Sequence, residues 1–270
     1  MLETTFLANL KTGKILNFKN FSVDNFAIGI GLAALVIFCA NQPLFVTSEP
    51  LQPSKISGMP DEAAQKIQRP WGLDVSHYQV GIDWKTLKKS GPRFVFAKAT
   101  EGITYVDRQF ESNRNAAKSV GLLFGAYHFY RPKDDPIMQA KHFLNHAKLG
   151  ANDLVPVLDL EIAPPTMNKE TYLRDVKKWI NYVKEQSGCT PMIYASPSFS
   201  NAYLGTSLDV RFYWMAEHSK NPHPPSGQSD WSLWQHTQTG HVAGFKGFVD
   251  LNWARSENAL NSLSCAKGTK

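Results

Sequence analysis

The sequence predicts an α/β fold: an irregular (β/α) barrel of eight strands, with incomplete helices in its second half. From residue 71 onward, short apolar runs alternate with helical stretches, which favours a parallel sheet. Eight such runs fit into roughly 190 residues, fewer than the about 250 of a full-length (β/α)₈ barrel. Beyond residue 195 the gaps between runs are short and rich in Ser, Pro, Asn and Gly, so complete helices fit poorly there.

The predicted strands are apolar runs bounded by turn-forming residues. They cover residues 72–75, 93–99, 122–129, 154–161, 191–195, 212–216, 232–235 and 248–252. The predicted helices cover residues 84–90, 108–120, 136–149 and 169–186. Asn168 is placed to cap the N-terminus of the last of these helices.

The N-terminal part of the chain is expected to lie outside this fold. Residues 26–40 are apolar and uncharged, and with the residues up to 46 they are long enough to cross a bilayer. Three lysines precede them, which is typical of a flank held in the cytoplasm. We expect a cytoplasmic segment at 1–25, a signal peptide or membrane anchor at 26–46, and a Pro-containing linker at 47–69. A clean small-x-small cleavage site is missing, which slightly favours the anchor, and both alternatives place the remainder outside the cytoplasm.

Composition narrows the class of partner. The formal net charge of +6 suits an anionic polymer, but no block of five Lys or Arg occurs, so a nucleic-acid partner is not expected. Seven Trp and nine Tyr are many for this length, and such residues either line a carbohydrate cleft or pack in the core.

Cys189 and Cys265 either pair in an oxidising compartment or remain free thiols. No metal-ligand spacing of Cys or His is present, so neither a metal nor a cofactor is expected.

The fourth predicted strand ends in two acids separated by one residue, Asp159 and Glu161. Side chains two apart on a strand point to the same face, at about 6–7 Å along the backbone. Two acids at the end of a buried strand are costly unless they have partners or a task. Cleavage of a glycosidic bond needs such a pair, although a structural ion pair at a strand end is the alternative.

Other predicted strands end in chemically functional side chains as well. These are Asp74, Lys98, Tyr127 with His128, Tyr194, Trp214, Trp234 with Gln235, and Asp250. Functional groups of (β/α) barrels collect at the C-terminal ends of the strands. Each residue also has a purely structural explanation: a carboxylate that caps a turn, a buried histidine with satisfied hydrogen bonds, or a tryptophan in the core. The agreement among all the strand ends favours one shared site.

Taken together, these motifs resemble glycoside hydrolase family 25, the muramidases also called Chalaropsis-type lysozymes. The matching motifs are Asp-Val-Ser-x-x-Gln at 74–79, Lys-Ala-Thr-Glu-Gly at 98–102, Gly-Ala-Tyr-His-Phe at 125–129, Asp-x-Glu at 159–161, Trp-Gln at 234–235 and Val-Asp-Leu-Asn at 249–252. The resemblance implies a distorted barrel that hydrolyses the β-1,4 bond after N-acetylmuramic acid in peptidoglycan. It places a catalytic domain at 70–258 and leaves a tail at 259–270, too short for a wall-binding module.

We expect Glu161 to be the general acid, because aromatic surroundings and neighbouring carboxylates raise the pKa of a carboxyl group. Asp159 then either attacks the anomeric carbon or orients the substrate's own 2-acetamido group, and we favour the second role. Asp74 and Asp250 lie on the first and last strands, which meet when a barrel closes, and would position the acetamido group or water. The expected substrate-binding residues are Tyr127, His128, Tyr194, Trp214, Trp234 and Gln235.

The expected partner is therefore the peptidoglycan glycan strand, acted on by an exported monomer. A chitinase-like glycosidase remains an alternative, because it also uses closely spaced acids on a barrel strand. A membrane-tethered protein that binds peptidoglycan without cleaving it is another. A nucleic-acid binder is the weakest alternative, since only the net charge supports it.

Overall fold

The computed structural model describes residues 69–164, 167–208, 210–226 and 230–265. All of these belong to one compact unit, Leu51–Lys270. The expected signal or anchor at 26–46 lies outside the described residues, as do residues 1–25 and nearly all of the expected linker. Within the described ranges, no helix has the length and apolarity needed to cross a membrane.

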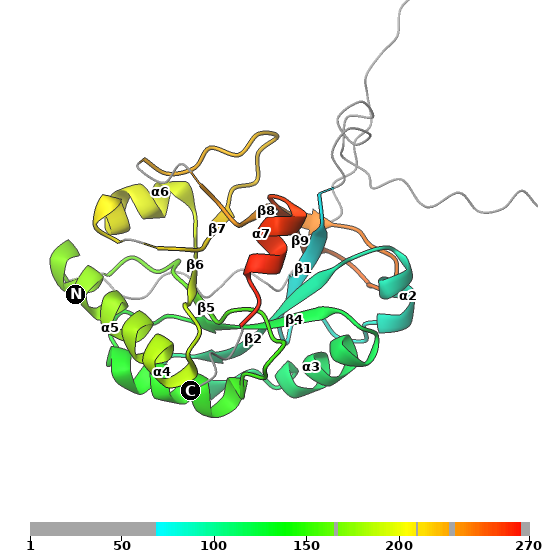
Figure 1. The fold of residues 1–270 in the computed structure, drawn as a ribbon, viewed down its shortest axis with the longest axis horizontal. Coiled ribbons are helices and arrows are strands. Elements are labelled where there is room, and N and C mark those ends of the chain that lie inside the picture. The colour runs from blue at the N-terminus through cyan, green and yellow to red at the C-terminus, as the bar shows by residue number, and fades with distance from the viewer. Residues whose placement is uncertain (1–68, 165–166, 209, 227–229, 266–270) are drawn as a thin grey trace, which may run out of the picture. The chain divides into compact units, whose positions relative to one another are not determined.

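Eight strands close into a barrel, as the sequence predicts. Around it run β1 (Trp71–Val75), β2 (Phe94–Glu101), β4 (Leu123–Phe129), β5 (Val157–Asp159), β6 (Met192–Ala195), β7 (Tyr213–Ala216), β8 (Leu233–Gly240) and β9 (Val249–Ala254). The barrel closes because β1 pairs with both β2 and β9. A ninth, two-residue strand, β3 (Tyr105–Val106), pairs only with the end of β2. The α/β barrel class is thus confirmed (Figure 1).

The last strand of the barrel runs against its two neighbours, whereas the sequence analysis expected a parallel sheet. Strand β9 is antiparallel to β1 and to β8, and the other pairs of the barrel are parallel. The physical reason is the short connection at 241–248, because a parallel crossover needs a dozen or more residues. Asp250, the second residue of β9, therefore reaches the end of the barrel where the parallel strands finish.

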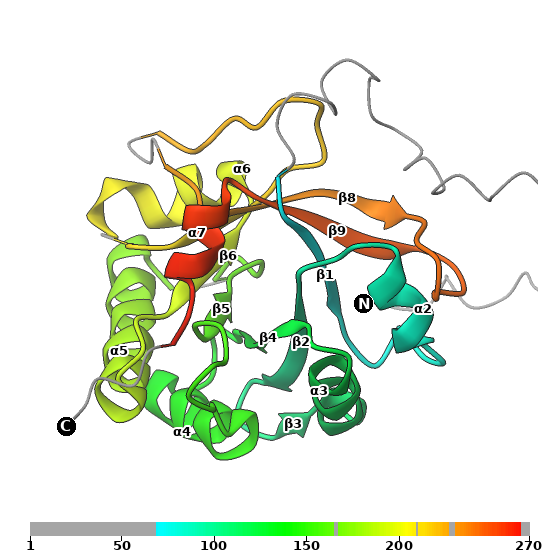
Figure 2. The ribbon, with the colours of Figure 1, turned by 45° about the vertical axis from the view of Figure 1, so that its right-hand side comes forward.

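Helices cover the first half of the barrel and are largely replaced by short turns in the second half (Figure 2). The first four are α2 (Trp84–Lys89), α3 (Phe110–Ser119), α4 (Pro136–Ala147) and α5 (Lys169–Ser187). Asp83, Asp135 and Asn168 cap α2, α4 and α5 through their side chains. Between β6 and β7 the described residues form only α6 (Pro197–Phe199), a π-helical turn at Ser200–Leu204 and a 3₁₀ turn at Gly205–Ser207. The expectation of incomplete helices in this half is confirmed.

Strand alternation divides the core into two layers. One cluster fills the barrel interior with large side chains, among them Phe94, Phe96, Val157, Met192, Trp214 and Leu233. A second cluster, which includes Val95, Phe124 and Leu158, packs between the strands and the helices. Gly125 permits the first arrangement, since a Cβ atom there would collide with the Phe96 ring.

The C-terminal residues pack against the barrel beyond the expected domain end at 258. Helix α7 (Glu257–Ser262) crosses that boundary, and Leu260 and Leu263 are fully buried. A disulfide joins Cys189 to Cys265, with their Cα atoms 5.4 Å apart, which settles the question that the sequence leaves open. Residues 259–265 therefore belong to the folded unit and do not form the expected tail.

Candidate active site

A cavity of about 540 Å³ opens at the end of the barrel where the parallel strands finish. Four carboxyl groups line it, those of Asp74, Asp159, Glu161 and Asp250. Four more of the residues expected at the site also line it: Tyr127, Tyr194, Trp214 and Gln235. The structure thus brings together side chains from β1, β4, β5, β6, β7, β8 and β9, in a cavity large enough for sugar rings.

Asp74 is buried on the wall where the barrel closes. Its carboxyl oxygens accept hydrogen bonds from Asn252 Nδ2 at 2.7 Å and from Gln235 Nε2 at 3.1 Å. Burial, and then the negative charge of Asp250, raise the pKa of Asp74 from 3.8 to about 8. Asp74 is consequently protonated over most of the neutral range.

Asp159 is the last residue of β5, and its side chain is 6% exposed. Burial and the charge of Glu161 raise its pKa well above the usual value, while the nearby Lys98 ammonium acts in the opposite direction. Among the described residues, its Oδ1 atom has no hydrogen-bond partner. A buried carboxyl oxygen without a partner is costly, so this atom is available to a donor that enters the cavity.

Glu161 lies two residues beyond Asp159 at the mouth of the cavity, with part of its side chain open to solvent. Removal of water by the surrounding protein raises the pKa of Glu161, and so does the negative charge that Asp74 carries once it ionises. A hydrogen bond with the Asp159 side chain lowers it, as do the positive charges of Lys98 and His218. Glu161 and Asp159 interact through their side chains, so the two acids titrate as a coupled pair. This arrangement supplies one acid that keeps its proton toward neutral pH beside a second carboxyl group.

A chain of hydrogen bonds fixes the wall opposite the acid pair. The buried Gln235 accepts hydrogen bonds at its Oε1 atom from Tyr194 Oη at 3.1 Å and from His218 Nε2 at 3.0 Å. Its amide nitrogen donates to Asp74, which sets the orientation of the amide. Deeper in the barrel, Trp214 Nε1 donates to Asn252 Oδ1 at 2.7 Å. The same Asn252 donates to Asp74, so the network runs from the mouth to the floor of the cavity.

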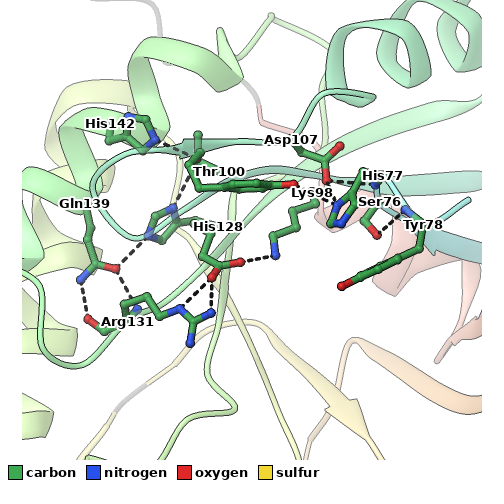
Figure 3. Close-up of polar contacts among 12 residues, drawn as sticks. Ser76, His77, Tyr78, Lys98, Thr100, Asp107, His128, Arg131, Gln139 and His142 are labelled. Carbon is green, nitrogen blue, oxygen red and sulfur yellow. Dashed lines mark hydrogen bonds and ion pairs between the residues drawn. The ribbon is translucent and has the colours of Figure 1, made fainter. Parts of the chain in front are cut away.

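Two residues expected to bind substrate lie elsewhere. His128 is fully buried outside the barrel wall, where its ring contacts Thr100 Oγ1 at 2.8 Å and Gln139 Oε1 at 3.1 Å (Figure 3). Burial lowers the pKa of His128 to about 3, so the ring is neutral. Trp234 packs in the outer layer and donates its indole N–H to Glu217 O at 2.6 Å. His128 follows Tyr127 on β4, and Trp234 precedes Gln235 on β8. Since Tyr127 and Gln235 face the cavity, and neighbouring residues of a strand point to opposite faces, His128 and Trp234 face away from it.

Several lining residues are absent from the expected set. Lys98 and Phe129 line the cavity from β2 and β4, with the Lys98 ammonium 4.6 Å from the centre of the Phe129 ring. Lys98 also pairs with Glu101 at 2.5 Å, and Glu101 in turn binds Arg131. Lys98 lies in a recognisable strand-end motif, whereas His218 follows β7 in a loop that carries no sequence signal. Among the described residues, no group of His, Cys, Asp and Glu could hold a metal ion.

The sequence model of the family "Glycosyl hydrolases family 25" matches residues 73–245, which run from within β1 past the end of β8 and include most of the residues that line the cavity. The chain belongs to this family. The resemblance seen in the motifs is thereby confirmed, and the family 25 chain is a glycosidase.

Relatives of this family 25 hydrolase include proteins of known and unknown activity. It is 36% identical to the uncharacterized protein YegX of Escherichia coli K12 over 186 residues, which cover 67% of this chain and 68% of that protein. It is 34% identical to lysozyme M1 of Streptomyces globisporus over 194 residues, covering 67% of this chain and 66% of the other. The crystal structure of the Streptomyces coelicolor lysozyme matches with a TM-score of 0.69 at 30% identity, covering 74% of this chain and 99% of that one.

Proposed function

We propose that this family 25 hydrolase is a lysozyme that hydrolyses the β-1,4 bond between N-acetylmuramic acid and N-acetylglucosamine in peptidoglycan. The observation that carries the proposal is the pair of Asp159 and Glu161 in one cavity, where Asp159 Oδ1 has no hydrogen-bond partner among the residues that the structure describes. The similarity to lysozyme M1 supports the substrate class. Two carboxyl groups beside the scissile bond are what glycoside hydrolysis requires.

Glu161 is the general acid of this proposal. It lies at the cavity mouth, where a leaving oxygen can reach it, and its pKa is raised chiefly by partial removal of water. A carboxyl group that stays protonated toward neutral pH can donate its proton to the leaving oxygen as the glycosidic bond breaks. After departure of the leaving group, the resulting carboxylate can accept a proton from the incoming water.

Asp159 orients the 2-acetamido group of the substrate, whose carbonyl oxygen attacks the anomeric carbon and gives retention of configuration. The unpartnered Oδ1 of Asp159 supports this role, since an amide N–H is the kind of donor that satisfies it. Direct attack by Asp159 is the other retaining scheme. Trapping a covalent glycosyl-enzyme on Asp159 would refute the acetamide version.

In this proposal the remaining cavity residues either bind the sugar or balance the charge of the acid pair. Asp74 and Asp250 lie opposite each other on β1 and β9 and line the cavity, where they position the acetamido group or water. Tyr127 and Tyr194 offer aromatic faces and hydroxyl groups to sugar rings, Trp214 forms part of the cavity floor beneath them, and Gln235 contacts a hydroxyl group. His128 and Trp234 have no direct role, because their side chains face away from the cavity.

We also propose that the enzyme acts as a monomer outside the cytoplasm, with residues 26–46 as a membrane anchor or a cleaved signal peptide. The Cys189–Cys265 disulfide supports this compartment, because disulfides persist in oxidising environments. Fractionation of cells followed by N-terminal sequencing of the mature protein distinguishes the anchor from the cleaved signal. A mature protein that begins after residue 46 would contradict the anchor.

Mass spectrometry of digested peptidoglycan tests the proposed function. The purified enzyme should release fragments that carry N-acetylmuramic acid at the reducing end. Release of chitin oligomers from chitin, with peptidoglycan left intact, would favour the chitinase-like alternative. Binding to peptidoglycan without new reducing ends would favour the non-catalytic binding protein.

A further inference from the structure

The loop between β1 and α2 presents an unusually exposed aromatic ring at the cavity mouth. Tyr78 is 79% exposed, yet it is one of the residues that line the cavity. Figure 3 shows its ring extending from the loop toward the side where Lys98 lies. Neither the catalytic acids nor the hydrogen-bond network around Gln235 involves this ring. The proposed chemistry therefore does not explain why an exposed aromatic ring occupies this position.

Hydrogen bonds fix the backbone of the loop that carries Tyr78. The buried Asp107 accepts hydrogen bonds at its Oδ2 atom from the His77 backbone N–H at 2.9 Å and from the His77 ring Nδ1 at 2.8 Å. Tyr105 Oη lies 3.1 Å from the same ring nitrogen. Within the loop, Ser76 N donates to Gln79 Oε1 at 2.9 Å. These contacts fix the loop to the start of α3 and to β3, so Tyr78 is presented from a preorganised base.

One face of the Tyr78 ring is covered and the other is free. The His77 ring packs against it with centroids 4.1 Å apart and an interplanar angle of 36°. The high exposure of Tyr78 means that the opposite face is open to solvent. A rigid aromatic ring with one open face at the edge of a sugar cleft is suited to the apolar C–H face of a pyranose ring.

We infer that Tyr78, seated on His77, forms an additional sugar-binding subsite for the glycan strand outside the pair of sugars whose linkage is cut. This inference rests on the proposed function. A long strand would pack one more ring on Tyr78, whereas a short oligosaccharide would end before it. The enzyme would thereby favour cleavage within long strands over cleavage of small fragments.

The test compares Tyr78→Ala and Tyr78→Phe with wild type on two substrates: uncross-linked glycan strands, and the disaccharide of N-acetylmuramic acid and N-acetylglucosamine, which contains only the pair of sugars whose linkage is cut. For Tyr78→Ala, the ratio of kcat/KM on strands to that on the disaccharide should fall by roughly tenfold, mainly through KM on strands. Tyr78→Phe should keep the ratio, because it keeps the ring. An unchanged ratio in Tyr78→Ala, or an equal loss on both substrates, would overturn the subsite.

Phe248→Ala is the matched control, since Phe248 is an exposed ring that packs beside a histidine, His241, with centroids 4.7 Å apart, but does not line the cavity. It should leave both substrates unaffected. Calorimetric titration of strands into Glu161→Gln, with and without Tyr78→Ala, measures binding without turnover. A Kd weakened by roughly tenfold supports the subsite, and an unchanged Kd contradicts it. If wild type cleaves neither substrate, the proposed function fails, and this titration still tests the subsite by itself.

Discussion

Asp74 of β1 and Asp250 of β9 lie directly opposite each other in an antiparallel strand pair, and both side chains line the cavity. The relationship exists because the last strand runs backward, so that its beginning meets the end of the first strand. Two carboxyl groups this close cannot both ionise easily, and burial strengthens the effect. The pKa of each is raised, and for Asp74 it reaches about 8.

Asp74→Asn should make the enzyme more stable at neutral pH. The folded state holds the Asp74 proton up to about pH 8, whereas the unfolded chain releases it near 3.8. The contribution of Asp74 to stability is thus full below pH about 3.8 and is lost as the pH rises toward about 8. The asparagine variant does not ionise and escapes that loss. Its Tm should match wild type near pH 4 and exceed it near pH 8, and a constant difference across this range would contradict the assignment.

Asn252→Ala should destabilise the barrel. Asn252 is fully buried and bridges Trp214 Nε1 to Asp74. Its removal leaves the indole N–H without this acceptor and leaves Asp74 Oδ2 with Gln235 alone as its donor. We expect a loss of about 1–3 kcal/mol in the free energy of unfolding, measured by urea denaturation. The exposed Asn115→Ala on α3 serves as the control and should change stability by less than about 0.5 kcal/mol. Equal losses in the free energy of unfolding for the two variants would mean that the hydrogen bonds of Asn252 do not stabilise the barrel.

His218→Ala should change the pH dependence of catalysis. The positive charge of protonated His218 lowers the pKa of Glu161, so its removal should raise that pKa and move the basic limb of kcat/KM to higher pH. Gln235 also loses one of its two donors, so KM should increase. His223→Ala is the control, because His223 pairs with Glu217 and does not line the cavity. A basic limb that stays in place, or moves to lower pH, would contradict the coupling.

Replacing both Cys189 and Cys265 with serine should lower stability but leave the cavity intact. The disulfide links residues 76 positions apart, and closing a loop of this length typically contributes about 2–4 kcal/mol. Urea denaturation of the double variant should show a loss of this size, and reduced wild type should match it. Neither cysteine lines the active-site cavity, so activity below the unfolding transition should persist. An unchanged unfolding midpoint would mean that the disulfide contributes nothing.

Local patterns in the sequence predict most of the fold. The apolar runs mark the eight barrel strands, and the Ser, Pro, Asn and Gly content after residue 195 signals the missing helices. The apolar pattern does not predict strand direction, because a parallel and an antiparallel strand can show the same run of apolar residues. Only the length of the 241–248 connection separates the two cases. The two-residue β3 is too short to produce any periodic signal.

The part of the candidate site that comes from strand ends can be predicted from the sequence, because the ends of the barrel strands meet in one place. The four acids, Tyr127, Tyr194, Trp214 and Gln235 do line one cavity. The chemistry of their side chains favours His128 and Trp234 as site residues as well. Side chains alternate along a strand, however, and the neighbouring residues Tyr127 and Gln235 face the cavity, so His128 and Trp234 face away from it. His218 and Tyr78 lie in loops, where no periodicity indicates the direction of a side chain.

The turnover number of Glu161→Gln on purified peptidoglycan tests the central claim most directly. Loss of a general acid should lower kcat by about 10²–10⁴, while KM and Tm stay close to those of wild type. Glu217→Gln is the matched control, because Glu217 is held by His223 and does not line the cavity. If Glu161→Gln retains activity within a few-fold of wild type, Glu161 is not the proton donor and the mechanism proposed for this cavity is wrong.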